Sequence, residues 1–217
     1  MLNRKEFPFF KELTHIRVDV EELLKVYQAL KDRKNEQSEF RFAEIRSELA
    51  KSFPFKEEKY DYVAVTDIDP SLRDTAVKAS PREMMKMVRD GTAPALDDRN
   101  YTRIRDDVPD YMRTFLSQFL GQVSRVRFAT LKPLSTIYEH IDNNVTHTAR
   151  VHVPLITDEF NLFGVRHKDD VQMMHLKVGH VYFVNTALSH FVVNSSKTVA
   201  RTHLVINLNS LEDILRD

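Results

Sequence analysis

Cysteine is absent from this chain of 217 residues. Its absence excludes disulfides, cysteine-held iron–sulfur clusters, zinc-finger thiolates and a cysteine nucleophile, so histidine and carboxylate side chains must bind any metal. Glycine is scarce, with 4 residues in the chain, which excludes a glycine-rich phosphate loop and a flexible glycine linker. The metal chemistry open to the chain therefore uses nitrogen and oxygen ligands.

The chain also lacks net charge and long apolar runs. Its 32 basic and 32 acidic residues cancel, so it lacks the basic surface of a nucleic-acid-binding protein and the attraction to an acidic membrane. No segment approaches the roughly 18 uninterrupted apolar residues of a membrane span. Charges within the first apolar run argue against a signal peptide. We expect a cytoplasmic protein of one domain, residues 1–217, without nucleic-acid or membrane partners; the oligomeric state stays open.

The first part of the chain is predicted to be mainly helical over residues 1–121. Apolar residues recur at helical spacing in four segments: 20–30, 42–49, 81–90 and 108–120. Asp19 is available as the N-cap of the first segment, and Gly121 follows the last. Residues 60–66 have the composition of a strand. Residues 91–106 are polar and without periodicity, which predicts a mobile loop.

After Ser124 the apolar period changes to two, which is typical of β-strands. Eight short strands are predicted: 125–132, 136–141, 149–156, 160–164, 172–177, 180–185, 190–194 and 200–208. Eight strands are the number that a double-sheet jelly roll needs. The fold class expected is α+β, with a double-stranded β-helix (jelly-roll, cupin-like) core over 124–209 and the N-terminal helices packed on one sheet.

A metal site is predicted in the second part of the chain, which holds eight of the nine histidines. His140 and Asp142 are two apart on a predicted strand, so both side chains lie on one face. His190, at the start of a later strand, is the natural third ligand. Two histidines and one carboxylate form the facial triad of non-haem Fe(II) oxygenases. The alternative is that His140 bonds a neighbour and His190 is a half-buried structural histidine.

Two arginines in apolar strands are the second sign of a binding site. By strand parity Arg150 shares a face with His152, and Arg201 shares one with His203. A cation that faces a barrel interior is costly unless it meets an anion. Guanidinium groups bind carboxylates bidentately, so a dicarboxylate ligand fits such a pair. The alternative is an edge strand whose arginines face water.

Four segments between Val123 and Asn209 resemble a known family: VRFATLKPLSTIYEHID, ARVHVPLIT, HLKVGHVYFVNTALSHFVVNSS and RTHLVINLN. In this order they resemble the aspartyl/asparaginyl β-hydroxylase branch of the Fe(II)/2-oxoglutarate-dependent dioxygenases. Within that branch they look most like the proline cis-4-hydroxylases. The resemblance implies a hydroxylase that uses Fe(II), the cosubstrates 2-oxoglutarate and O₂, and ascorbate as a reductant. It implies that His140, Asp142 and His190 are catalytic and bind the iron.

The resemblance also implies the residues that hold the cosubstrate. Arg150 and His152 match the pair at the 1-carboxylate end of 2-oxoglutarate, and Arg201 matches the arginine at its distal carboxylate. Ala129 stands where the peptide-modifying enzymes have a serine that helps hold the distal carboxylate. His203 lies in the matching R-x-H segment, and its role stays open between a structural one and support of the site.

The substrate implied first is a free amino acid or a small amino-acid derivative, as in the proline hydroxylases. An Asp or Asn side chain of a peptide or protein is the second candidate. A non-catalytic jelly-roll module that binds a metal or carboxylate is an alternative from another class. The carboxylate at Asp142 favours hydroxylation over halogenation, because related halogenases have a small residue there. His147 could touch substrate from its loop, or it could be a solvated loop histidine.

Overall fold

The computed structural model describes residues 7–32, 60–68, 70 and 97–216. The helical segments predicted at 42–49 and 81–90 lie outside the described residues, as does the start of the predicted loop. Within the described part of the chain, the helices are too short and too polar to span a bilayer.

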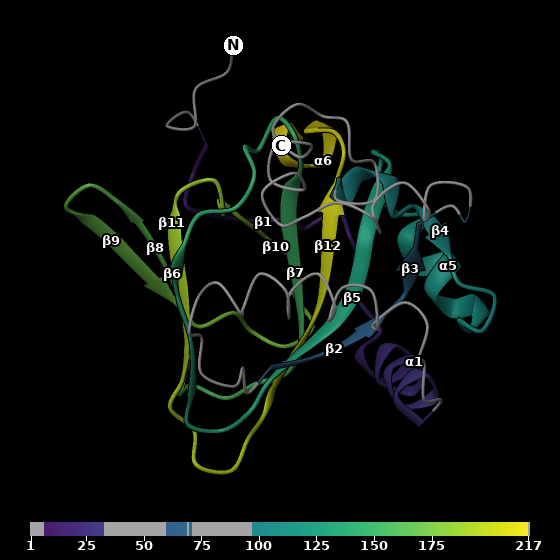
Figure 1. Ribbon diagram of the computed structural model, residues 1–217, viewed down its shortest axis with the longest axis horizontal. Coiled ribbons are helices and arrows are strands. Elements are labelled where there is room, and N and C mark those ends of the chain that lie inside the picture. The colour runs from purple at the N-terminus through teal and green to yellow at the C-terminus, as the bar shows by residue number, and fades with distance from the viewer. Residues whose placement is uncertain (1–6, 33–59, 69, 71–96, 217) are drawn as a thin grey trace, which may run out of the picture.

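Two antiparallel sheets face each other across the molecule (Figure 1). The larger sheet has the strand order β1-β10-β7-β12-β5-β2, and the smaller one the order β6-β11-β8-β9. The strands are β1 (Phe10–Glu12), β2 (Tyr60–Ala64), β5 (Val123–Leu131), β6 (Ser135–His140), β7 (Ala149–Ile156), β8 (Asn161–His167), β9 (Asp170–Met174), β10 (Tyr182–Val184), β11 (Ser189–Asn194) and β12 (Arg201–Leu208). The chain from β5 to β12 winds between the two sheets, which is the double-stranded β-helix that the sequence predicts.

Alternation along the strands of the larger sheet separates two environments. On β5, Val126 and Phe128 belong to the core cluster on the outer side of the sheet, whereas Leu131 belongs to the cluster between the two sheets. On β7, Val151 and Val153 belong to the outer cluster. His152, between them, faces the smaller sheet, because successive side chains of a strand point to opposite faces.

Helices cover the outer side of the larger sheet (Figure 1). Helix α1 (Val20–Asp32) begins as predicted, since the Asp19 carboxylate accepts the Glu22 N–H at 3.1 Å. Its buried residues are Leu23, Val26, Tyr27 and Leu30. Helix α5 (Asp110–Leu116) is shorter than the predicted 108–120. It ends early because the buried Asp213 carboxylate accepts the N–H groups of Leu120 and Gly121 at 3.1 and 3.2 Å, which a continued helix would need. Asp213 belongs to the short helix α6 (Glu212–Leu215).

The described part of the predicted loop at 91–106 contains two short elements, and its mobility stays a prediction. A 3₁₀ turn, η3 (Asp98–Asn100), is followed by β4 (Arg103–Ile104). Strand β4 pairs with β3 (Thr66–Asp67), which continues from β2 after Val65. Local polarity predicted a loop because it carries no information about a partner strand located far away in the chain. Two of the four helical segments predicted in 1–121 lie outside the described residues, so the mainly helical character of this part stays a prediction.

Candidate active site

His140, Asp142 and His190 converge at one end of the smaller sheet. His140 ends β6 and is the direct cross-strand partner of His190 on β11. The His140 Nε2 atom lies 3.8 Å from Asp142 Oδ1, and the His190 Nε2 atom lies 3.4 Å from Asp142 Oδ2. One ligand atom from each residue lies within 4.8 Å of the others. The arrangement matches the size of a site for a single metal ion.

A break in strand pairing brings His140 to this position. His190 faces His140, but Val192 faces Ile137, so β6 contains one more residue than β11 over this stretch. Such a bulge turns the local backbone and re-aims the side chains next to it. Asp142 follows β6, and its backbone N–H donates to the Thr186 carbonyl at 2.9 Å. Main-chain contacts therefore hold the ligand residues in place: the pairing of β6 with β11 holds the two histidines, and the hydrogen bond to Thr186 holds Asp142.

The two histidines present the same ring nitrogen to the site. His140 Nδ1 lies 2.7 Å from the Tyr138 carbonyl oxygen, and His190 Nδ1 lies 3.0 Å from the Leu188 carbonyl oxygen. A carbonyl only accepts, so each Nδ1 carries a hydrogen, and in the neutral ring the lone pair lies on Nε2. Contacts of this kind orient histidine ligands and fix their tautomer. Both lone pairs are available in the space beside Asp142.

The charge states of the site suit a cation. Burial and the neighbouring His190 ring lower the pKa of His140. Burial alone would raise the pKa of Asp142, but the contacting Arg150 guanidinium and the two histidines hold it well below its usual range. Asp142 is therefore ionised and His140 neutral near pH 7. Metal ligands must be deprotonated, so no proton has to leave these two groups before a metal binds.

The predicted arginines face the space between the sheets. The Arg201 side chain is buried, with 3% exposure, so the alternative of a solvent-facing arginine is wrong for this residue. Its guanidinium carbon lies 5.7 Å from the centre of the Phe163 ring. The same ring stacks on His190 at 5.8 Å between centroids. Phe163 therefore links the ligand set and Arg201 within one interior.

His152 is buried between these groups without a hydrogen bond. The residue is 5% exposed, and both ring nitrogens lack a partner in the structure. Burial lowers the pKa of His152 well below its usual value, and the charges of Arg201, Arg150 and Arg127 lower it further. Buried polar atoms are nearly always satisfied in native proteins. A neutral histidine with two unmet nitrogens among arginines fits an anionic ligand such as 2-oxoglutarate.

Arg127 is an interior residue that the sequence analysis missed. It lies on β5 between Val126 and Phe128, both of which face the outer core. Its Nη1 donates to the Arg125 carbonyl at 2.8 Å, and its guanidinium carbon lies 5.9 Å from the centre of the Tyr62 ring. The strand parity that placed Arg150 and Arg201 in the interior applies equally to Arg127, and it could have found this residue.

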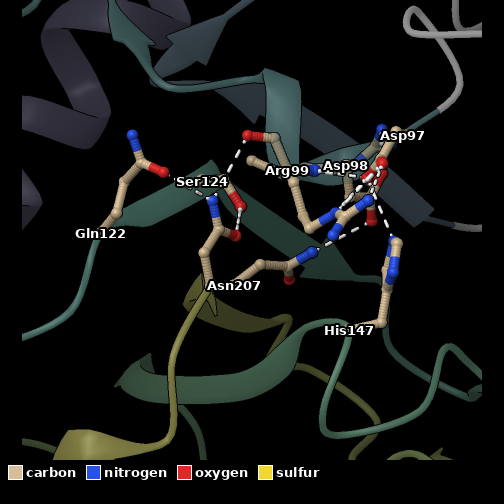
Figure 2. A network of polar contacts seen from close by, with 9 residues as sticks. Asp97, Asp98, Arg99, Gln122, Ser124, His147 and Asn207 are labelled. Carbon is tan, nitrogen blue, oxygen red and sulfur yellow. Dashed lines mark hydrogen bonds and ion pairs between the residues drawn. The ribbon is translucent and has the colours of Figure 1, made fainter.

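A polar network connects the segment that begins at residue 97 to the strand ends near the candidate metal ligands (Figure 2). His147, from the loop that follows Asp142, lies 3.1 Å from Asp97 Oδ1. Asp98 accepts from Arg125 at 2.9 Å and from the Asn207 amide at 3.0 Å. His147 is thus half-buried and paired with a carboxylate, and a contact with substrate stays a prediction.

Comparison with known proteins gives the family. Residues 78–210 match the family model described as aspartyl/asparaginyl beta-hydroxylase, which covers more than half of the chain. Among curated proteins, none matches. One similar solved structure is a 2OG-Fe(II) oxygenase family oxidoreductase from Burkholderia pseudomallei, at 17% identity over 70% of this chain and 67% of that one, with a TM-score of 0.40. Another is a Pseudomonas putida prolyl-4-hydroxylase, at 12% identity over 93% of each chain, with a TM-score of 0.39.

Structural similarity at these TM-scores does not show the family. The family is shown by the match over residues 78–210. That match includes the ligand set, Arg127 and the interior cations. The chain belongs to the aspartyl/asparaginyl β-hydroxylase family and is an oxygenase.

Proposed function

We propose that the protein hydroxylates a free amino acid or a small amino-acid derivative, with Fe(II) held by His140, Asp142 and His190. The observation that supports the ligand set is its geometry: three ligand atoms within 4.8 Å of one another, with both histidine tautomers fixed by main-chain carbonyls. Fe(II) with 2-oxoglutarate and O₂ would supply the oxidation that places a hydroxyl on a substrate carbon. The chain itself binds, orients and excludes water.

The same proposal assigns 2-oxoglutarate to the interior between the sheets. Arg150 lies beside Asp142, and Arg201 starts β12 opposite Leu131, at the far end of the larger sheet. His152 lies near both arginines, whose charges lower its pKa. A dicarboxylate can therefore lie lengthwise, with Arg150 and His152 at its end nearest the metal ligands and Arg201 at its distal carboxylate. Guanidinium groups match both carboxylates.

The free amino acid is favoured by a further cation at the metal side. Arg127 is buried, and its charge acts on His152 together with the charges of Arg150 and Arg201. A free amino acid has a carboxylate that the interior residue of a peptide lacks. Asn207, at the same side of β12, is fully buried, and its amide oxygen lacks a donor. An ammonium group is a donor of the required kind.

A turnover assay tests this function. The purified protein is supplied with Fe(II), ascorbate and 2-oxoglutarate, and succinate is measured with no addition, with each common free amino acid, and with peptides that contain Asp or Asn. We expect succinate formation to rise with at least one free amino acid, whose mass increases by one oxygen. Stimulation by peptides alone would replace the free amino acid by the peptide substrate. Absence of any succinate with iron-loaded protein would contradict the oxidation itself.

A further inference from the structure

His203 has a buried ring nitrogen whose role the proposed function leaves open. It lies on β12 two residues after Arg201 and is 1% exposed. Its Nδ1 lies 2.9 Å from Arg201 Nη2, whereas its Nε2 has no hydrogen-bond partner. The ring of His152 lies 5.7 Å away between centroids. His203 thus stands among the groups assigned to the cosubstrate.

The tautomer of His203 follows from the chemistry of its partner. A guanidinium group donates hydrogen bonds and never accepts them, so the Nδ1 atom must accept from Arg201. Burial and the Arg201 charge lower the pKa of His203 well below its usual value, so the ring is neutral. A neutral imidazole that accepts at Nδ1 carries its hydrogen on Nε2. The unmet Nε2 atom is therefore an N–H donor that needs an acceptor.

The two strands beside β12 offer no side-chain acceptor at the positions paired with His203. Ala129 on β5 is its direct cross-strand partner and is fully buried. On the other side, Pro154 of β7 is the cross-strand partner of His203. Neither side chain has a polar atom. A histidine that only oriented Arg201 would use its Nδ1 and would leave Nε2 without a function in a buried place, which is costly.

We propose that the His203 Nε2–H donates directly to the distal carboxylate of 2-oxoglutarate, so that Arg201 and His203 together form its binding site. The inference rests on the proposed function. Ala129, directly across the sheet from His203, has no donor of its own to offer to this carboxylate. In this arrangement Arg201 supplies the charge and His203 supplies the second, directional hydrogen bond.

Direct binding tests this role without turnover. The Mn(II)-loaded protein is titrated by calorimetry with 2-oxoglutarate and with 2-oxopentanoate, which has a methyl group in place of the distal carboxylate. We expect His203→Leu to weaken 2-oxoglutarate binding about tenfold and to leave 2-oxopentanoate binding unchanged. His203→Gln, which has a similar volume and retains an N–H donor, is the matched control and should lose much less. Equal affinity of His203→Leu and the parent protein for 2-oxoglutarate would overturn the proposal.

A second substitution separates direct contact from a positioning role. Ala129→Ser in the His203→Leu background places a hydroxyl donor across the sheet, but it cannot accept from Arg201 as Nδ1 does. We expect it to restore much of the lost affinity for 2-oxoglutarate. A failure to restore it would make His203 a positioning residue of Arg201 and overturn the direct hydrogen bond. If the parent protein with Mn(II) binds no 2-oxoglutarate, the proposed function fails rather than this inference alone.

The tautomer can be read independently of binding. Nitrogen-15 NMR of histidine-labelled protein, assigned with His203→Gln, should show His203 in the neutral form with its hydrogen on Nε2. Addition of 2-oxoglutarate to the Mg(II)-loaded protein should shift the Nε2 resonance and leave Nδ1 nearly unchanged. A hydrogen on Nδ1, or no shift of Nε2 at saturating 2-oxoglutarate, would contradict the inference.

Discussion

The two faces of the larger sheet differ although the same strands form both. Its outer face is apolar and packs against α1 and α5, as Phe128 does against Tyr27 with ring centroids 5.1 Å apart. Its inner face presents arginines and histidines, several with polar atoms that the protein does not satisfy. The outer face supplies stability through burial of apolar surface, and the inner face gives up some of that stability to bind ligands.

The largest effect should come from the metal ligands. His140→Ala or His190→Ala removes an imidazole that no neighbour can replace, so we expect 2-oxoglutarate turnover to fall at least about a hundredfold. Folding should be retained, because the ligands lie at one end of the smaller sheet and outside the outer core. Succinate formation at saturating Fe(II) and thermal unfolding measure the two quantities.

His180→Ala is the matched control for the ligand variants. His180 pairs with Glu12 on the surface, with 43% of its side chain exposed, and its loss should leave turnover unchanged. Near-normal turnover in either ligand variant would show that the metal is bound elsewhere.

The next effect concerns the outer face alone. Phe128→Ala deletes a fully buried ring, and such deletions typically cost about 3–5 kcal/mol of unfolding free energy. Urea unfolding checks the loss, and the KM for 2-oxoglutarate of the folded protein should stay unchanged. Phe163→Ala is the matched change on the inner side, where the ring contacts His152 and His190, and it should change that KM. An altered KM for 2-oxoglutarate in Phe128→Ala would contradict the inference that the outer face contributes to stability alone.

Acid should lower the free energy of unfolding through two buried histidines of the inner face. His152 and His203 are buried and neutral, with pKa values well below normal, whereas the unfolded chain protonates them near pH 6.5. Their contribution is therefore fully present above that pH and is lost as the pH falls below it. The expected slope is about 1.4 kcal/mol per pH unit for each histidine. Urea unfolding of the metal-free protein at pH 7, 6 and 5 measures it, and His203→Leu should remove one histidine's share.

The smallest effect should separate the cosubstrate site from the metal site. Arg201→Ala is expected to raise the KM for 2-oxoglutarate about tenfold, equivalent to ~1.4 kcal/mol. Arg201→Lys should restore only part of this, because a point charge cannot reproduce the bidentate contact. Iron affinity should change little, since the substitution leaves all three ligands in place. An unchanged 2-oxoglutarate dependence would place the cosubstrate away from Arg201.

Much of the jelly roll could be predicted because period-two alternation is a local property. The eight strands from 123 to 208 lie within a few residues of their predicted bounds. Parity also placed His152 and Arg201 inside the structure. Strand β1 could not be predicted in this way, because three residues show too little alternation and it forms only by pairing with β10.

Long-range contacts set the limit of sequence-based prediction in the site. Asp98 meets Asn207, 109 positions further along the chain, and nothing in the local pattern of either segment specifies the pairing. The early end of α5 has the same origin, since Asp213, from a distant part of the chain, accepts the N–H groups of Leu120 and Gly121, which follow the helix. The ligand triad was predictable because two of its three members are near neighbours in sequence.

The bulge in β6 brings two residues at an odd spacing to one interior face. Ile137 packs in the cluster between the sheets, so strict alternation from it would turn Glu139 inward and His140 outward. The local turn of the backbone at the bulge is what allows Ile137 and His140, three positions apart, to face the same interior. Removing one of the two residues between them would make the spacing two, equal to that of His190 and Val192 on β11, so regular pairing alone would keep both side chains on the interior face. The bulge therefore compensates for an odd spacing, and the position of the first iron ligand depends on it for as long as that spacing is three.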